Sequence, residues 1–315
     1  MRSVHGARTW RFSQRDAGKD RALPSREAAR LVNPADTDRR TRIAAIAALL
    51  LAMASFQAGA SIAKTLIPQI GAPGTAALRV GLGALIVAIV QRPWRTMPRS
   101  WRSILVYGLS LGTMNLVFYM SLRTIPLGIA VALEFTGPLA VAAFSSRRPS
   151  HFLWLALAVV GLLFLLPLNL TSTRIDPVGA GFALAAGACW AVYIIFGQRS
   201  GVAHGASASA WGMMIGSLVA VPVGVASART ALLDFTILPF GIAMAVLSSS
   251  IPYTLEMFGL RNLSARVFGT LMSLEPAFGA FAGFIFFRER LTTVQVLAIA
   301  AVMAASIGTT AGSAE

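Results

Sequence analysis

The chain has 315 residues, of which 56% are hydrophobic and only 12% charged, and its mean hydropathy is +0.70. Because soluble domains average about 25% charged residues, most of the surface of this protein must face lipid rather than water. The formal net charge of +15 fits a nucleic-acid-binding protein, but 11 of the 27 Lys and Arg residues lie within residues 1–42 and most others lie in short loops between apolar runs. We therefore expect no nucleic-acid partner. The single cysteine, Cys189, excludes an intramolecular disulfide.

Residues 1–42 form a polar leader with eleven basic and five acidic residues. The leader has no apolar central segment, which excludes a secretory signal peptide, and its acidic residues count against an organellar transit peptide. We expect a basic, disordered cytoplasmic tail. The alternative is a start codon assigned too far upstream.

Ten apolar runs follow, each close to the length of about 20 residues that a membrane-spanning helix needs. The runs in the first half are 43–63, 73–90, 103–122, 128–145 and 151–168, and those in the second half are 178–198, 206–226, 237–257, 267–287 and 292–311. This pattern predicts an all-α polytopic membrane protein with ten transmembrane helices.

The distribution of Lys and Arg predicts the orientation of these helices. With the N-terminus inside, twenty of these residues fall in the inner segments and six in the outer segments, and without the leader the ratio is nine to six. Positive charge is enriched on the cytoplasmic side of membrane proteins. Both the N- and the C-terminus are therefore predicted to be cytoplasmic.

The two halves of the chain are related in sequence. Residues 122–138 and 260–276 superimpose without a gap at an offset of 138 residues, and residues 49–57 repeat weakly at an offset of 134. Because each half contains five helices, an odd number, two similar halves must insert with opposite orientations. We expect two inverted five-helix repeats (5+5), spanning residues 43–168 and 178–311.

Two glutamates, Glu134 and Glu275, lie within apolar runs and close to prolines. When the two halves are aligned at the offset of 138 residues, Glu134 falls three residues before the position that corresponds to Glu275. Three residues are about one helical turn. A carboxylate in hydrocarbon is costly and indicates function. Desolvation favours the protonated carboxyl group, whereas a nearby cation favours the charged one. A glutamate under both influences can bind and release a proton, so each of the two is a candidate for proton coupling. A permanently paired or helix-capping glutamate is the alternative.

Other polar residues at membrane depth are candidates for substrate binding. Arg79 can clamp a carboxylate with its forked guanidinium; the alternatives are an ion pair with Glu134 or Glu275, or snorkelling. Glu134 is also the candidate for recognising an ammonium group. The remaining candidates are Gln57, Lys64, Asn115 and Tyr193.

These remaining candidates have structural alternatives. Gln57, Asn115 and Tyr193 can be interhelical hydrogen-bonding residues, and Lys64 can snorkel. Glu256 is expected to pair with Arg261 instead of serving the site. Ser248 to Ser250 are expected to satisfy carbonyls that Pro252 leaves free. The glycine pairs 108/112 and 212/216 are expected to pack helices within the monomer.

The sequence contains no constellation typical of an enzyme. Its three histidines lie at or near loops, so we expect no metal site, and no Walker loop is present. No nucleophile stands at a recognisable spacing from a base. We therefore expect neither an enzyme nor a cofactor, and any transport would have to use an ion gradient.

The string SLEPAFGAFAGFIFFRERLT (273–292) resembles the end-of-repeat signature of the EamA-type drug/metabolite transporters, and AGACWAVY (186–193) resembles the start of that repeat. The matching positions are Glu275, Pro276, Glu289, Leu291 and Thr292. Residues 53–66, 77–85 and 115–149 narrow the resemblance to the amino-acid exporters of this family. The first repeat departs from the signature, because Gly137 occupies the position of Glu275.

The resemblance implies efflux of threonine, homoserine or related small neutral amino acids across the bacterial inner membrane, by proton antiport with alternating access. The expected partners are thus an amino acid, protons and the lipid bilayer, with the protein a monomer or homodimer. Export of another small metabolite or an amphipathic drug is the alternative within the family. A membrane-embedded enzyme or a scaffold that transports nothing is the alternative outside it.

Overall fold

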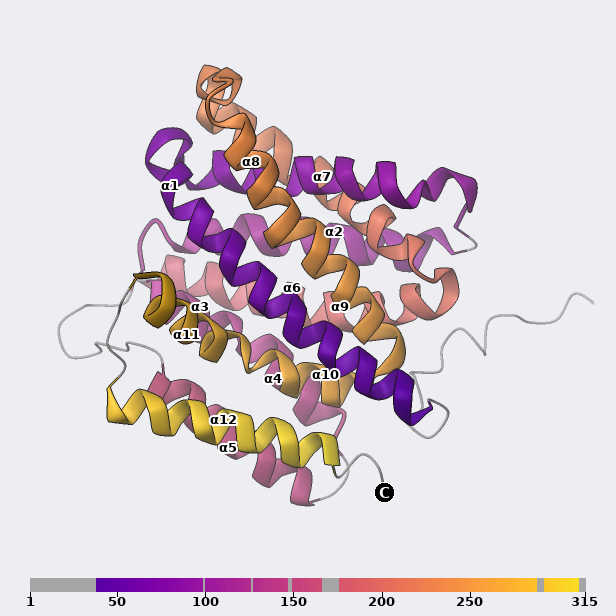
Figure 1. The fold of residues 1–315 in the computed structure, drawn as a ribbon, viewed down its shortest axis with the longest axis vertical. Coiled ribbons are helices and arrows are strands. Elements are labelled where there is room, and N and C mark those ends of the chain that lie inside the picture. Colours follow the sequence, from indigo (N-terminus) through magenta and orange to yellow (C-terminus); the bar gives the residue numbers. More distant parts are fainter. Residues whose placement is uncertain are drawn as a thin grey trace, which may run out of the picture.

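The computed structural model describes residues 38–98, 100–125, 127–146, 149–165, 176–287 and 292–311. Within these ranges every regular element is helical, and ten helical segments follow the ten predicted runs (Figure 1). The leader up to residue 37, Arg174, Glu289 and Leu291 lie outside the described residues.

The first half contains α1 (Arg39–Gln91), α2 (Trp101–Ser121), α3 (Leu127–Glu134), α4 (Thr136–Phe144) and α5 (Pro149–Leu165). The second half contains α6 (Pro177–His204), α7 (Ser207–Ala228), α8 (Leu238–Ala245), a π-helix (Val246–Ser250), α9 (Ile251–Asn262), α10 (Ala265–Met272), α11 (Glu275–Phe287) and α12 (Thr293–Ala311). Two short 3₁₀ helices occupy Pro93–Arg95 and Arg229–Leu233.

Among the described residues, six segments are long and apolar enough to cross a membrane. They are Arg39–Ala63, Thr65–Gln91, Trp101–Ser121, Pro177–His204, Ser207–Leu232 and Leu238–Asn262. The other four segments are shorter or interrupted. Large apolar side chains also remain exposed along these helices, as expected for a multi-pass protein whose outer surface is covered by lipid.

The first predicted loop, between residues 63 and 73, is wrong: α1 continues through it as helix. The interruption comes only at Gly71, whose φ of 71° and ψ of 166° need the freedom of glycine. Leu66 and Ile70 are buried against Ile237 and Met244, which keeps this stretch packed as helix.

Two helices are broken at prolines, and each break places a glutamate at a helix end. Pro138 has no N–H with which to bond the carbonyl of Glu134, the last residue of α3. Pro276 likewise cannot bond the carbonyl of Met272, the last residue of α10, and α11 restarts at Glu275. The chain therefore contains two discontinuous helices, α3/α4 and α10/α11.

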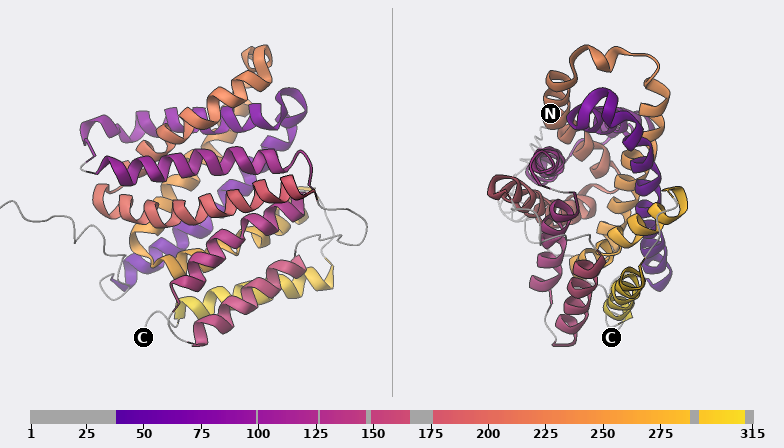
Figure 2. Two further views of the ribbon diagram at one scale, coloured as in Figure 1. Left: turned by 180° about the vertical axis from the view of Figure 1, so that it is seen from behind. Right: turned by 90° about the vertical axis from the view of Figure 1, so that its left-hand side faces the viewer.

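Close helix contacts hold the bundle around these breaks. A Cβ on Gly112 would lie 2.4 Å from the carbonyl oxygen of Gly216, and one on Gly108 would lie 2.8 Å from that of Gly212. The prediction that these glycine pairs pack helices within the chain is confirmed. Two views show α5 beside α12 at one edge of the bundle (Figures 1 and 2).

Candidate functional site

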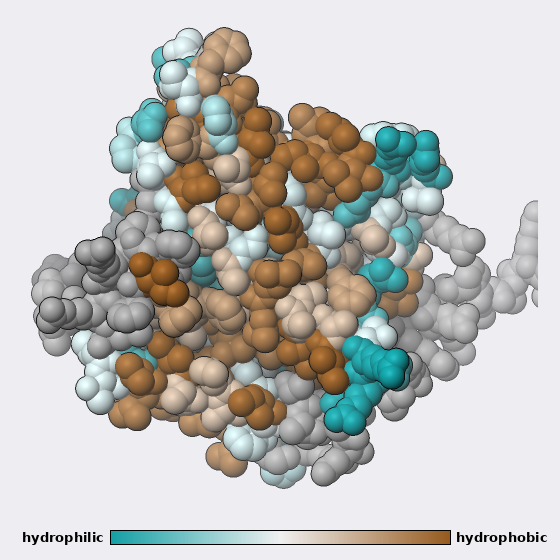
Figure 3. Space-filling view, viewed as in Figure 1, coloured by the Kyte–Doolittle hydropathy of each residue, from teal (hydrophilic) through white to brown (hydrophobic). Residues whose placement is uncertain are grey.

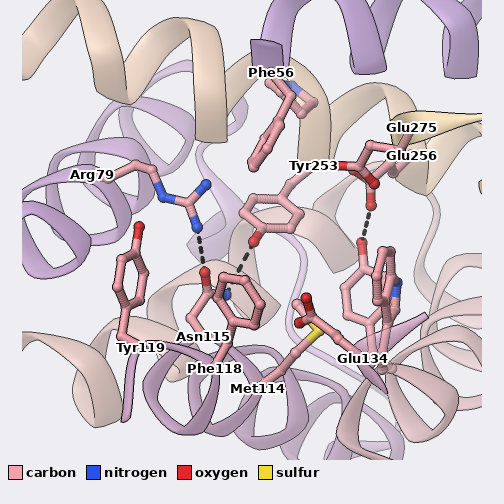
Figure 4. A pocket seen from close by; sticks show the side chains of 13 residues that line it. Phe56, Arg79, Met114, Asn115, Phe118, Tyr119, Glu134, Tyr253, Glu256 and Glu275 are labelled. Carbon is pink, nitrogen blue, oxygen red and sulfur yellow. Dashed lines mark hydrogen bonds between the residues drawn. The ribbon is translucent and has the colours of Figure 1, made fainter. Parts of the chain in front are cut away.

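A cavity of about 110 Å³ lies between α1, α2, α3, α6, α9 and α11 (Figure 4). Its wall combines aromatic rings with groups of both charge signs. The apolar lining residues are Phe56, Met114, Phe118, Trp190 and Pro252, and the polar ones are Arg79, Asn115, Tyr119, Glu134, Tyr193, Tyr253, Glu256 and Glu275. Such a wall suits a small molecule that carries both a positive and a negative group.

Arg79 is held in place by uncharged partners. Its side chain is only 6% exposed, and its guanidinium donates to the carbonyl of Ser248 at 3.2 Å and to Oδ1 of Asn115. The Ser248 carbonyl is available because Pro252, four residues later, has no N–H to donate to it. The Phe56 ring, with its centroid 5.3 Å from the guanidinium carbon, adds a cation–π contact.

The geometry decides between the alternatives for Arg79. Within the described residues neither Glu134 nor Glu275 forms an ion pair with it. The guanidinium also lines the interior cavity, so snorkelling to the membrane surface does not account for it. Its charge is therefore not cancelled by direct contact with a carboxylate.

Asn115 orients the cation of the cavity. Its amide nitrogen donates to the carbonyl of Leu111 at 2.9 Å and to the hydroxyl of Tyr253 at 3.1 Å, which leaves Oδ1 turned towards Arg79. Asn115 is itself held by hydrogen bonds to the protein, and it therefore fixes the position of the guanidinium. Tyr253 connects α9 to the same hydrogen-bond network (Figure 4).

Three carboxylates, of Glu134, Glu256 and Glu275, line the cavity. In Figure 4, Arg79 reaches in from the left, while Glu256 and Glu275 lie together on the right and Glu134 lies below. The hydroxyl of Tyr193 donates to Glu256 Oε2 at 2.7 Å. Glu275 is the first residue of α11, where the positive end of the helix dipole favours a negative charge.

The expected pairing of Glu256 with Arg261 is wrong. On a helix, neighbours along one face are three or four residues apart, whereas these residues are five apart and point to different sides. Arg261 instead packs along Gly201 of α6. Glu256 is thus a site residue that sequence reasoning missed, although its five-residue spacing from Arg261 was a usable signal.

One predicted binding residue, Gln57, does not line the described part of the cavity wall. Nε2 of Gln57 donates to the backbone carbonyl of Glu275 at 3.3 Å, so it ties α1 to the start of α11. The side chain of Lys64 lies outside the described part of the structure. The structure brings together four predicted binding residues and the predicted proton-coupling residue Glu275 on one cavity wall; the four are Arg79, Asn115, Glu134 and Tyr193.

The serines before Pro252 play a different part from the one expected. Ser248 Oγ donates to the carbonyl of Met244 at 2.7 Å, and Ser250 Oγ donates to that of Gly83 at 3.3 Å. The carbonyl that Pro252 leaves free is taken by Arg79. In the described ranges, no group of three or more His, Cys, Asp or Glu side chains is placed to hold a metal ion.

A multi-pass helical bundle with two proline-broken helices and a central cavity of mixed charge has the architecture of a membrane transporter. Residues 177–311 match the EamA-like transporter family. Threonine/homoserine exporter RhtA of Salmonella typhimurium (strain SL1344) is 55% identical over 267 residues, which cover 84% of this chain and 90% of that protein. RhtA of Escherichia coli (strain K12) is 54% identical over 267 residues, which again cover 84% of this chain and 90% of that protein. This chain belongs to the EamA-like transporter family.

A solved structure supports the fold independently. A crystal structure of a protein 16% identical to this chain superimposes with a TM-score of 0.68, covering 85% of this chain and 98% of that one. At this identity the likeness concerns the fold alone. The family match and the similar exporters make this protein a multi-pass membrane transporter and not an enzyme.

Proposed function

We propose that this protein exports threonine, homoserine and related small neutral amino acids from the cytoplasm across the inner membrane. The relatives that are 54–55% identical carry the name threonine/homoserine exporter, and the similarity extends over nine tenths of their length. The observation that carries the proposal is the cavity, where an arginine that pairs with no carboxylate among the described residues faces three glutamates.

The chemistry of the cavity matches a zwitterionic amino acid. The carboxylate of the substrate binds the Arg79 guanidinium, which has a forked donor geometry and, in the described part of the chain, no competing ion pair. The ammonium group binds the carboxylates opposite, with Glu134 as its main partner. A side-chain hydroxyl can hydrogen-bond to the tyrosines that line the same space.

The size of the cavity favours an amino acid over an amphipathic drug, the alternative within the family. Benzene fits an apolar protein cavity of roughly 150 Å³, and this cavity has about 110 Å³. Threonine and homoserine are slightly larger than benzene, so a small widening of the cavity admits them, whereas an amphipathic drug needs several times this volume. Export of another small amino acid remains the competing proposal.

We infer that residues 43–168 and 178–311 form two inverted repeats with both termini cytoplasmic. Corresponding helices of the two halves pack against each other: the discontinuous helices α3/α4 and α10/α11 through α4 and α10, α5 with α12, and the second half of α1 with α7. Such pairs are expected on either side of a pseudo-two-fold axis. The start of α1 and the end of α12 lie on the same side of the molecule (Figure 1), and the Lys and Arg distribution makes that side cytoplasmic.

We propose that protons drive the export, with Glu134 and Glu275 as the coupling residues. Both lie at helix breaks, where a change in charge can move one half of a helix relative to the other. Glu275 is tied to α1 through Gln57, so a change at this carboxyl can reach the contact between α1 and α11. Alternating access then arises from rocking one repeat against the other.

Inside-out membrane vesicles test this function. Labelled homoserine should accumulate when the vesicle lumen is made acidic, and the accumulation should disappear when a protonophore collapses the gradient. Glu275→Gln should abolish gradient-driven uptake while its amount in the membrane equals that of wild type. Asp234→Asn, which removes a carboxylate from an exposed loop, is the matched control and should transport normally.

Two results would contradict the proposal in different ways. Full gradient-driven uptake by Glu275→Gln would remove this residue from proton coupling but leave the substrate intact. No uptake of homoserine or threonine by the wild-type protein, at normal levels in the membrane, would reject the substrate. Competition with other small amino acids would then identify the alternative.

A further inference from the structure

A second hollow, separate from the polar cavity, lies on the outer face of the bundle. It is a groove of about 760 Å³ between α1, the α10–α11 break and α12. Its floor and walls are apolar, with Leu50, Leu274, Phe278 and Ile307 among the lining residues, whereas one end is lined by Arg39 and Arg42. Figure 3 shows hydrophilic side chains gathered at the start of α1 and apolar ones along the face beside it.

The length of the groove matches one leaflet of a membrane. Along α1 it runs from Arg39 to Leu50, eleven residues that rise about 16 Å in a helix. Half of a bilayer's hydrocarbon core is about 15 Å thick. An acyl chain that starts at the membrane surface therefore fits along the groove to about the bilayer midplane.

We propose that this groove is a binding site for an anionic phospholipid of the leaflet in which α1 begins. Its phosphate binds Arg39 and Arg42, because guanidinium groups match the geometry of phosphate oxygens. One acyl chain packs against the apolar walls. In the topology proposed above this leaflet is the cytoplasmic one, but the binding itself does not depend on the transport activity.

Charge selects the occupant. Two arginines lie at one end of a groove whose other lining residues, except Ser306, are apolar. Residues 1–42, which lead into α1, carry eleven basic and only five acidic residues. Basic clusters next to a membrane-spanning helix attract anionic lipids, and each cation contributes about a fivefold gain in affinity. A zwitterionic lipid fills the same apolar groove without that gain.

The groove also lies directly behind the polar cavity. Leu274 lines the groove, and the next residue, Glu275, lines the cavity. Gln57 of α1 bonds the backbone carbonyl of Glu275 from the neighbouring helix. A lipid chain in the groove thus supports the contact between α1 and the start of α11, so bound lipid should stabilise the folded protein.

Native mass spectrometry of the purified full-length protein tests the site, with phosphatidylglycerol and phosphatidylcholine of identical acyl chains as probes. We expect phosphatidylglycerol to bind and to raise the melting temperature at roughly 25-fold lower concentration, about fivefold for each arginine. The double variant Arg39→Gln/Arg42→Gln should lose this preference. The matched control, Arg95→Gln/Arg102→Gln, changes two exposed arginines outside the groove and should keep it.

A second variant tests the groove itself. Ile307 is 66% exposed, so Ile307→Trp fills the apolar part without disturbing the core and should weaken the binding of both lipids. Equal binding of the two lipids by the wild-type protein, or unchanged preference in Arg39→Gln/Arg42→Gln, would overturn the proposal. So would a lipid-free dimer that Ile307→Trp converts to monomers, because a second copy would then occupy the groove.

Discussion

Arg79→Lys is the most informative change at the cavity, because it keeps the positive charge and removes the fork. The guanidinium makes two hydrogen bonds to the protein, to the Ser248 carbonyl and to Asn115 Oδ1, and still faces the cavity. A lysine ammonium is a single point on a flexible stem. It cannot hold both protein acceptors and also present two parallel N–H groups to a carboxylate.

The structure sets the size of the effect. One buried acceptor left without a donor costs about 1–3 kcal/mol of stability, which a protein in a membrane can tolerate without unfolding. Loss of one hydrogen bond to the charged carboxylate of the substrate costs about 1.5–3 kcal/mol, which weakens homoserine binding by about 10- to 150-fold. The maximal transport rate should change less than the affinity.

Vesicle uptake measured over a range of homoserine concentrations separates these two effects. Arg102→Lys, at the exposed start of α2, is the matched control and should behave as wild type. Competition with 3-aminopropan-1-ol, which is homoserine without its carboxylate, sharpens the test. The wild-type protein should bind homoserine much more tightly than this amine. In the Arg79→Lys variant the difference between the two affinities should be smaller. An unchanged preference in the variant would refute the role of Arg79 as the carboxylate clamp.

Three further predictions concern other parts of the chain. Glu256→Gln retains an acceptor for the Tyr193 hydroxyl but removes the charge, so homoserine affinity should fall by about tenfold with normal folding; unchanged affinity would make Glu256 purely structural. Gly137→Ala would place a Cβ 2.0 Å from the Gly187 carbonyl oxygen and should cost about 1–3 kcal/mol in a thermal unfolding assay, whereas Gly181→Ala, with open space around it, should not destabilise. Asp176 caps α6, and the N–H of Gly179 that donates to it lowers its pKa. Asp176→Ala should therefore lower the melting temperature at pH 7, and this difference should vanish as acid protonates the carboxyl of wild type.

Much of the fold follows from the sequence because the membrane leaves the chain few options. Backbone groups in hydrocarbon must be bonded within helices, so apolar runs of sufficient length define the helical segments. The charges buried in those runs were informative for the same reason. Arg79 and Glu275 are costly in lipid, and the structure places both on one cavity.

The partners of these residues could not be predicted, because they depend on how distant helices pack. Arg79 donates to the carbonyl of a residue 169 positions away, and nothing local to either residue indicates the contact. Gln57 was a candidate for substrate binding with an interhelical hydrogen bond as the alternative, and it bonds the backbone of Glu275. A polar side chain on an apolar helix shows that a partner is needed, but not whether that partner is a ligand or another helix.

The unequal positions of the two central glutamates have a packing explanation. In the repeat frame, the position of Glu275 is taken in the first half by Gly137, and a Cβ there would lie 2.0 Å from the carbonyl oxygen of Gly187 on α6. Any side chain at this position must push the two helices apart, so a glutamate is strongly disfavoured there. The first half carries its carboxylate at Glu134 instead, about one turn earlier, at the end of α3 and still on the cavity wall. Close contact between α4 and α6 thus requires the two halves to present their carboxylates differently, and the two glutamates are suited to different tasks.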